Sequence, residues 1–139
     1  MSTAYAELVQ AMQLYFDGFH EGDVETLQKV FHPNCHLISG TGGTLVDDPM
    51  PAVYDRVRGR TAPAAAGQPR HDHILSIDLA GPEGALVTCR IAIAPKLFTD
   101  YLNFVKLDGQ WRIVSKVFTW VKIEDAAGAH PAVTAQAAE

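Results

Sequence analysis

The stretch from Tyr101 to Phe118 constrains the fold of this chain more than any other. Two runs rich in aromatic and β-branched residues flank Asp108-Gly109, a dipeptide that tolerates the positive φ of a tight hairpin turn. The pattern predicts a long antiparallel hairpin. Apolar residues occupy both faces of that hairpin, so the rest of the chain is expected to cover it on both sides.

Apolar periodicity predicts three helices in the first half of the chain. Over 5–19, apolar residues recur every three or four positions, which indicates a helix with one wide apolar face. Gly22 can end this helix in a left-handed conformation, and a shorter helix is expected over 23–31. A third is expected over 48–60, where Asp48-Pro49 supplies a cap and a first-turn proline.

Strands account for most of the remaining chain. Short strands are expected at 35–39 and 44–46, and the proline-containing segment 61–70 is expected to be a surface loop. Two alternating runs, at 71–79 and 85–94, predict a second hairpin that precedes the one starting at Tyr101.

Helices followed by strands predict an α+β fold, in which a strongly curved antiparallel sheet wraps around three N-terminal helices and encloses a pocket. Residues 1–123 are expected to form this single domain, with a flexible tail over 124–139, where large apolar residues run out.

Composition excludes several classes of partner. The net charge of −5, from 16 acidic and 11 basic residues, argues against nucleic acid or an anionic membrane surface. No apolar run approaches the roughly 20 residues that a spanning helix needs, so a cytoplasmic protein is expected. Cys35 and Cys89 lack metal-ligand spacing and are expected to be free thiols. No glycine-rich phosphate cradle is present, and no cofactor is expected.

Several motifs resemble those of a known superfamily. Tyr15-Phe-x-Gly-Phe-x-x-Gly-Asp23 and Asp108-Gly-Gln-Trp-Arg-Ile113 resemble the nuclear transport factor two-like superfamily, and the stretch 98–118 is similar to its subgroup labelled “putative lumazine-binding”. The resemblance implies a cone of curved sheet and three helices with an internal pocket, and a homodimer formed through the sheet. The superfamily hosts isomerases, cyclases, dehydratases, hydrolases and non-enzymatic binders, so the resemblance bears on fold more than on function.

The steroid isomerase of that superfamily gives a specific comparison. It uses an aspartate base and an oxyanion hole made of a tyrosine and a protonated aspartic acid. By resemblance, these three positions correspond to Ser39, Tyr15 and Asn103. A serine hydroxyl is not a useful base at neutral pH, so this mechanism is disfavoured, although Asn103 can still donate a hydrogen bond.

Strand alternation extends this comparison to a set of pocket residues. If Asn103 points inward, Tyr101 does too, and the same register carried across the turn places Val114, Lys116 and Phe118 inside. The predicted ligand-binding residues are Tyr15, Phe19, Phe31, His71, Arg90, Tyr101, Asn103, Lys116, Phe118 and Trp120. The opposite row, with Leu102, Phe104, Ile113 and Val117, becomes the candidate dimer face.

Lys116 and Arg90 in an apolar pocket need a carboxylate neighbour or an anionic ligand. The sequence therefore predicts a protein that binds a small anionic or carbonyl-bearing organic compound. Lys116 could instead pair with Asp100 or Asp17, or remain solvated.

Two alternatives remain open. One is an isomerase or lyase in which Tyr15 and Asn103 stabilise an oxyanion while His71 or His73 moves a proton. The other is a non-catalytic dimeric interaction module. The two histidines share a strand face, but their spacing is not specific for a metal, and no metal site is predicted. The arginines Arg56, Arg58, Arg60 and Arg70 are interpreted as a solvated face.

Overall fold

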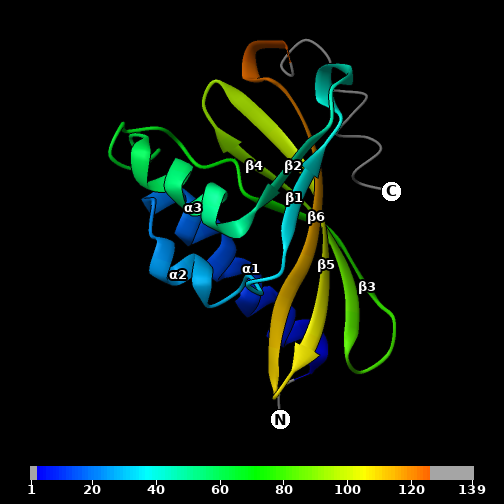
Figure 1. Ribbon diagram of the computed structural model, residues 1–139. Helices are drawn as coiled ribbons and strands as arrows, with labels where there is room; N and C mark the ends of the chain where they lie inside the picture. Colours follow the sequence, from blue (N-terminus) through cyan, green and yellow to red (C-terminus); the bar gives the residue numbers. More distant parts are fainter. Residues whose placement is uncertain (1–2, 126–139) are drawn as a thin grey trace.

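The computed structural model describes residues 3–125, in which helices cover one face of a single curved sheet (Figure 1). The helices are α1 (Ala4–Glu21), α2 (Val24–Gln28), the short 3-10 helix η1 (Thr41–Gly43) and α3 (Met50–Gly59). The strands are β1 (His36–Ser39), β2 (Val46–Pro49), β3 (His73–Leu79), β4 (Gly84–Ile93), β5 (Lys96–Leu107) and β6 (Gln110–Lys122).

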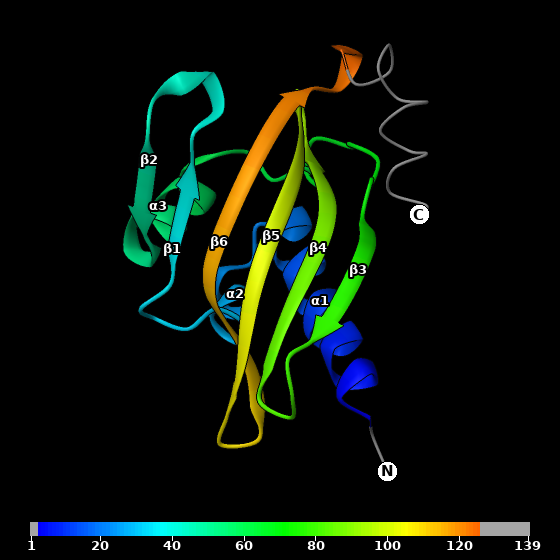
Figure 2. The same ribbon diagram turned by 90° about the vertical axis from the view of Figure 1, so that its right-hand side faces the viewer.

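The strands lie in the order β2-β1-β6-β5-β4-β3, and Figure 2 shows them in front of the helices. All neighbouring pairs are antiparallel except β1 and β6, which are parallel. The predicted α+β class is confirmed, but the sheet is mixed rather than wholly antiparallel. The parallel pair arises because the chain crosses from β2 through α3 to the far edge of the sheet and returns to β6 beside β1.

Helix α1 packs closely on α2 because one glycine permits the turn between them and another permits their close contact. Gly22 ends α1 with φ at 68°, the left-handed conformation that glycine adopts readily. A Cβ on Gly18 would lie 2.5 Å from Leu27 Cδ2, so a larger residue there would push the two helices apart. The buried side of α1 carries Leu8, Met12, Tyr15, Phe16 and Phe19, as the periodicity predicted, whereas Tyr5 and Val9, which belong to the same predicted stripe, are exposed.

The β5–β6 hairpin confirms the predicted turn and contains a bulge that the sequence pattern did not reveal. Asp108 and Gly109 have φ of 50° and 78°. Asn103 pairs with Ser115, whereas the next residue, Phe104, pairs with Ile113. Val114 is therefore an extra residue on β6, and the inward row shifts by one position there.

The predicted inward row of β5 is wrong. The inward row contains Asp100, Leu102 and Phe104, all buried, while Tyr101 and Asn103 are exposed on the opposite face. Beyond the bulge, Lys116 pairs with Leu102 rather than with Tyr101. Three members of the predicted dimer face, Leu102, Phe104 and Ile113, are thus core residues, and only Val117 is exposed.

Two local predictions near α3 are wrong. The strand expected at 44–46 begins at Val46 instead, and Asp48 belongs to β2 rather than capping the helix. Pro49 is the N-cap of α3 and provides no side-chain hydrogen bond. The Asp48 carboxylate is instead 3.1 Å from Arg56 Nη1, so it joins β2 to the second half of α3.

Within residues 3–125, no helix has the length and apolar character to cross a membrane. The predicted tail begins at residue 124, and residues 123–125 form a helical turn after β6. The rest of that tail, 126–139, lies outside the described residues.

Candidate functional site

A pocket of about 400 Å³ opens between α3, β1 and β2 and the adjoining ends of β4, β5 and β6. Its position follows from the fold, because α1 fills the other end of the curved sheet and α3 leaves this end less covered. Apolar side chains form most of the wall, and the polar groups are few and mostly cationic. The lining residues are Phe19, Leu37, Ser39, Thr41, Val46, Asp48, Val53, Arg56, Val57, Arg60, Ile91, Ile93, Ala94, Pro95, Lys96, Phe98, Lys116, Phe118 and Trp120.

A buried charge pair lies at the floor of this pocket. Lys116 is only 5% exposed and Asp100 is fully buried, with Lys116 Nζ 3.5 Å from Asp100 Oδ2. The Tyr15 hydroxyl donates a hydrogen bond to the same Oδ2, and Cys89 Sγ lies 3.8 Å from it. Asp100 Oδ1 is buried and has no hydrogen-bond partner among residues 3–125. Within the described residues, Oδ2 of this carboxylate therefore has hydrogen-bond and charge partners, whereas Oδ1 has none.

Aromatic rings surround the Lys116 ammonium on several sides. Its Nζ is 4.9 Å from the ring centroid of Phe19, 5.2 Å from that of Phe118 and 5.3 Å from that of Tyr15. These distances permit cation–π attraction, which is stronger where water is excluded. Together with Asp100, the rings hold a lysine charge in a place that is otherwise apolar.

The groups behind Lys116 keep their protons. Burial raises the pKa of the Tyr15 hydroxyl well above its usual range, and the charge on Asp100 raises it further. Burial also raises the pKa of Cys89 well above its usual value, with Asp100 again adding to the effect. Tyr15 is therefore a hydrogen-bond donor, and neither it nor Cys89 is set up as an anionic nucleophile.

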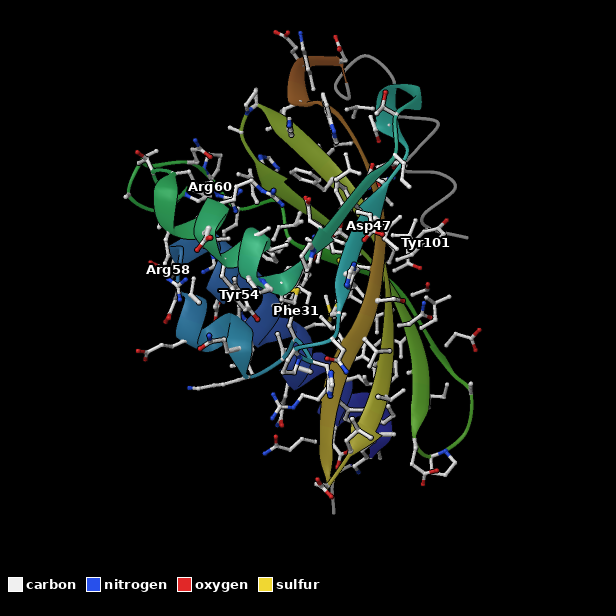
Figure 3. The ribbon with its side chains drawn as sticks, viewed as in Figure 1. Phe31, Asp47, Tyr54, Arg58, Arg60 and Tyr101 are labelled. Atoms are coloured by element: carbon white, nitrogen blue, oxygen red, sulfur yellow. The ribbon has the colours of Figure 1, made fainter. Side chains whose placement is uncertain are left out.

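Two arginines from the region of α3 bring further positive charge to the pocket. Arg60, at the C-terminal end of α3, has a buried Nη2 without a hydrogen-bond partner among the described residues. Burial lowers the pKa of its guanidinium, and the charge of Arg56 lowers it further. Arg56 is paired with Asp48, whereas Arg58 points elsewhere and lies 3.7 Å from Asp55 (Figure 3). Of these three arginines, Arg60 is thus the one without a carboxylate partner among residues 3–125.

The arrangement suits a ligand with an anionic end and an apolar body. Arg60 can bind a carboxylate or phosphate oxygen, and Lys116 can donate a hydrogen bond to a carbonyl oxygen deeper in the pocket. Lys96 also lines the pocket, but its Nζ lies 4.3 Å from the ring centroid of Trp120. Lys116 can transfer a proton directly to Asp100, because the ammonium and the carboxylate are in contact.

Four of the predicted ligand-binding residues line this pocket: Phe19, Lys116, Phe118 and Trp120. Of the alternatives for Lys116, the structure shows the pair with Asp100. Tyr15 and Phe31 are buried directly behind the wall, with their ring centroids 5.8 Å apart. Ser39, which takes the place of the isomerase base, also lines the pocket, where its hydroxyl lies 3.1 Å from that of Thr41.

The other predicted residues do not reach the pocket. Asn103 and Tyr101 lie on the opposite face of the sheet, and Figure 3 shows Tyr101 on the side away from α3. Arg90 alternates with the buried Cys89 and is paired with His73 across β3 and β4, so it faces outward as well. His71 and His73 are exposed at the edge of the sheet.

An oxyanion hole shared by Tyr15 and Asn103 is therefore incompatible with this geometry. The prediction fails because it placed Asn103 in the inward row of β5, whereas that row contains Leu102 and Phe104. Asn103 instead donates a hydrogen bond from Nδ2 to Ser115 Oγ, 2.8 Å away on the exposed face.

Sequence reasoning missed Arg60 and Arg56 as pocket residues. A usable signal exists: Val53, Arg56, Val57 and Arg60 follow the three- and four-residue spacing of one helix face. The two valines are buried, and the two arginines share their stripe, whereas Arg58 does not. Asp100 was foreseen only as one possible partner of Lys116.

Among residues 3–125, no group of three or more His, Cys, Asp or Glu side chains is arranged to hold a metal ion. Both cysteines in this part of the chain are free and buried.

Comparisons with known proteins agree with this architecture. The structure of an NTF-2 like protein of unknown function from Silicibacter pomeroyi matches with a TM-score of 0.77 at 24% identity, covering 87% of this chain and 100% of that one. An NTF2-like protein of unknown function from Shewanella baltica matches with a TM-score of 0.76 at 21% identity, covering 87% and 98%. These similarities show the fold alone.

A curated relative, aldolase FrzH from Cladobotryum sp., is 24% identical over 119 residues, which are 84% of this chain and 91% of the relative. Residues 4–119 match a family described as “Putative lumazine-binding”. The match spans the helices and nearly all of the sheet. The chain therefore belongs to the family described as “Putative lumazine-binding”.

Proposed function

We propose that the protein binds a small organic anion in the pocket beside α3. The observation that carries the proposal is Arg60 Nη2, which is buried in the pocket region and has no hydrogen-bond partner among the described residues. A buried N–H group without a hydrogen-bond partner typically costs about 1–3 kcal/mol. A carboxylate or phosphate on a ligand would supply the missing partner.

The rest of the pocket favours an apolar ligand body. Its volume of about 400 Å³ lies in the range of small-molecule sites, and aromatic and aliphatic side chains such as Phe98, Phe118 and Ile93 form its walls. At the floor, Lys116 can donate a hydrogen bond to a carbonyl or hydroxyl oxygen. A small organic acid with a ring or branched chain and a second oxygen function fits these features.

3-Phenyllactate is a suitable probe, because it combines a carboxylate, a hydroxyl and a phenyl ring. Binding to the full chain can be followed by calorimetry or by the fluorescence of Trp120, which lines the pocket. The uncharged amide of the same compound is the matched control. We expect the acid to bind about ten-fold or more tightly than the amide, since a charged hydrogen bond contributes about 1.5–3 kcal/mol.

Two arginines of the same helix region separate a pocket effect from a general charge effect. Arg60→Met should weaken phenyllactate binding about ten-fold or more and leave binding of the amide unchanged. Arg58→Met removes the same charge from an exposed position beside Asp55 and should change neither affinity. Equal losses in the two variants would contradict the proposal. So would tight binding of lumazine itself that is insensitive to Arg60→Met.

A catalytic role, as a lyase that acts on a carbonyl compound, is the second candidate. It is favoured by the Lys116–Asp100–Tyr15 cluster, which places an amine and a carboxylate with a spare oxygen at the floor of the pocket. The relative named aldolase FrzH adds support, because an aldolase forms or breaks a carbon–carbon bond next to a carbonyl group. Such chemistry requires removal of a proton from the carbon beside the carbonyl.

That proton transfer can be measured directly. Phenylpyruvate in D₂O exchanges the hydrogens beside its carbonyl, and nuclear magnetic resonance follows the rate. We expect the protein to accelerate the exchange over buffer and Asp100→Asn to abolish the acceleration, because an amide cannot accept the proton that Lys116, the group lining the pocket, has to lose before it can act as a base. Exchange at the buffer rate with the native protein would leave binding as the function.

We also propose that the outer face of the sheet joins two copies of the chain. Tyr101 and Val117 are direct neighbours on β5 and β6 and are 52% and 47% exposed. Val121, on the same row of β6, is 49% exposed. A row of exposed apolar side chains on an open sheet face is typical of a contact surface between proteins.

A further inference from the structure

Lys116 is the member of the buried cluster that a ligand can reach. Its side chain lines the pocket, whereas Asp100 and Tyr15 lie behind it and do not. A structural ion pair would be equally well satisfied in a closed core. Here the amine stands at the floor of a pocket of about 400 Å³, and the carboxylate stands on its far side.

The bulge at Val114 is what brings Lys116 to this place. Without it, Lys116 would pair with Tyr101 and share the outer row; with it, Lys116 pairs with Leu102 and follows the buried side of β6. The rings of Phe19, Phe98 and Phe118 then border its Nζ at 4.9, 6.0 and 5.2 Å. An amine at such a protected position can act as a covalent nucleophile toward carbonyl compounds.

Asp100 is placed to accept the proton that the amine has to lose. Its Oδ2 is 3.5 Å from Lys116 Nζ, and its Oδ1 is buried without a hydrogen-bond partner in the described chain. The Tyr15 hydroxyl, held on Oδ2, fixes the orientation of the carboxylate. The amine, the proton acceptor and the orienting hydroxyl therefore come from three different elements, β6, β5 and α1.

We propose that Lys116 forms an imine with the carbonyl carbon of a small oxo acid whose acidic group is bound by Arg60. The inference rests on the proposed function, since Arg60 selects and orients the anion. The Lys116 ammonium transfers a proton to Asp100, and the free amine adds to the carbonyl carbon to give a carbinolamine. The carbonyl oxygen then leaves as water, and the C=N bond forms.

The step is balanced without any further reagent. An ammonium and a carbonyl compound give a protonated imine and one water molecule, so the positive charge remains on the Lys116 nitrogen beside Asp100. The protonated imine withdraws electrons from the neighbouring carbon and eases removal of a proton from it.

Reductive trapping tests the proposal on the full chain. Phenylpyruvate is incubated with the protein and sodium cyanoborohydride, and intact-mass and peptide mass spectrometry locate the product. We expect one reduced phenylpyruvate unit per chain, attached to Lys116. The exposed Lys29 and Lys122 serve as internal controls and should remain unmodified under the same conditions. Phenyllactate, which has no carbonyl, should give no adduct and should block the reaction by competition.

Two variants of Lys116 test whether the adduct requires its amine and control for a loss of adduct through misfolding. Lys116→Met removes the nucleophile but leaves Asp100 buried without its ammonium, so circular dichroism has to confirm that the variant folds. Lys116→Arg keeps a cation beside Asp100 and lacks a nucleophilic amine. It should form no adduct, whereas Arg58→Met, which leaves Lys116 and the pocket lining unchanged, should form the adduct as the native protein does.

The possible outcomes separate this inference from the proposed function. If phenyllactate binds and phenylpyruvate leaves no adduct on Lys116, the imine is excluded and anion binding stands. Labelling spread over Lys29, Lys96 and Lys122, or unchanged labelling in Lys116→Arg, would overturn the inference as well. Labelling of Lys116 without any effect of Arg60→Met would instead support the imine and contradict the anion site.

Discussion

The two faces of the β5–β6 hairpin are similar in apolar content and differ in what their polar residues contact. On the inner face, Asp100 and Lys116 are withdrawn from water, contact each other and adjoin a pocket. On the outer face, Asn103 and Ser115 share a hydrogen bond at the surface, next to the exposed Tyr101. Polar groups of the inner face depend on one another for stability, whereas those of the outer face can still bind water.

The largest expected difference between the faces follows from removing one polar side chain on each. Asp100→Ala leaves a buried ammonium without its counter-ion and should lower the free energy of unfolding by about 3–5 kcal/mol. Asn103→Ala breaks one exposed hydrogen bond and should cost about 0.5 kcal/mol. Urea denaturation at neutral pH measures both. Similar losses would show that the inner pair is better solvated than its burial indicates.

A double substitution sharpens this result. Asp100→Leu combined with Lys116→Met replaces the charge pair by apolar side chains. Because replacing a whole buried pair is often neutral or stabilising, the double variant should recover most of the stability lost in Asp100→Ala. If it is as unstable as the single variant, packing around Asp100 rather than charge determines the cost.

A smaller effect is expected when one tyrosine on each face loses only its hydroxyl. Tyr15→Phe removes the donor to Asp100 Oδ2 and should cost about 1–3 kcal/mol, the typical penalty for a buried acceptor left unsatisfied. Tyr101→Phe changes an exposed side chain and should stay within about 0.5 kcal/mol. Urea denaturation measures the free energy of unfolding of both variants. A loss in Tyr101→Phe as large as that in Tyr15→Phe would contradict the assignment of the two faces.

The sequence predicted which segments form helices and strands better than it predicted which face each strand buries. The turn at Asp108-Gly109 needs positive φ at both residues, a local requirement that the dipeptide reveals. The stripe on α1 is likewise a property of a single element. On β5, by contrast, Tyr101 and Val105 in one row are as suitable for a core as Leu102 and Phe104 in the other. Alternation alone could not choose between them.

The bulge at Val114 explains why the inward row was predicted wrongly for β5 but correctly for Lys116, Phe118 and Trp120 on β6. It shifts the pairing by one residue, so Lys116 and Phe118 face the pocket although the register predicted for Asn103 is wrong. A bulge depends on pairing between two strands and has no reliable local signature. The role of Arg60 was missed for a different reason: a group of arginines near a loop is usually solvated, and only the spacing from Val53 and Val57 distinguishes Arg60 from Arg58.

The pH dependence of stability provides a further test of the inner face. Burial raises the pKa of Cys35 from its ordinary value of 9.0 to about 12, with the charge of Lys116 acting in the opposite direction. Between pH 9 and 12 the folded chain therefore holds a proton that the unfolded chain has released. Stability should fall as pH rises through this range, by up to about 1.4 kcal/mol per pH unit for one such group.

Cys35→Ala should make that decline shallower, whereas Asn103→Ala on the outer face should leave the slope unchanged. The comparison uses the slope of the free energy of unfolding against pH and not its absolute value, because Cys35→Ala also creates a small cavity. An unchanged slope in Cys35→Ala would mean that the thiol ionises in the folded protein as readily as in the unfolded chain.

The smallest effect on folding and ligand binding is expected from a substitution on the outer face. Val117→Glu places a charge in the row that we propose joins two copies of the chain. It should convert a dimer to a monomer in sedimentation equilibrium and change phenyllactate affinity by less than about two-fold. Val117 shares a strand with Lys116 and Phe118 but points away from the pocket, so the two faces should respond independently. If Val117→Glu weakens the ligand as much as Arg60→Met does, the faces are coupled and the pocket needs the second copy for its shape.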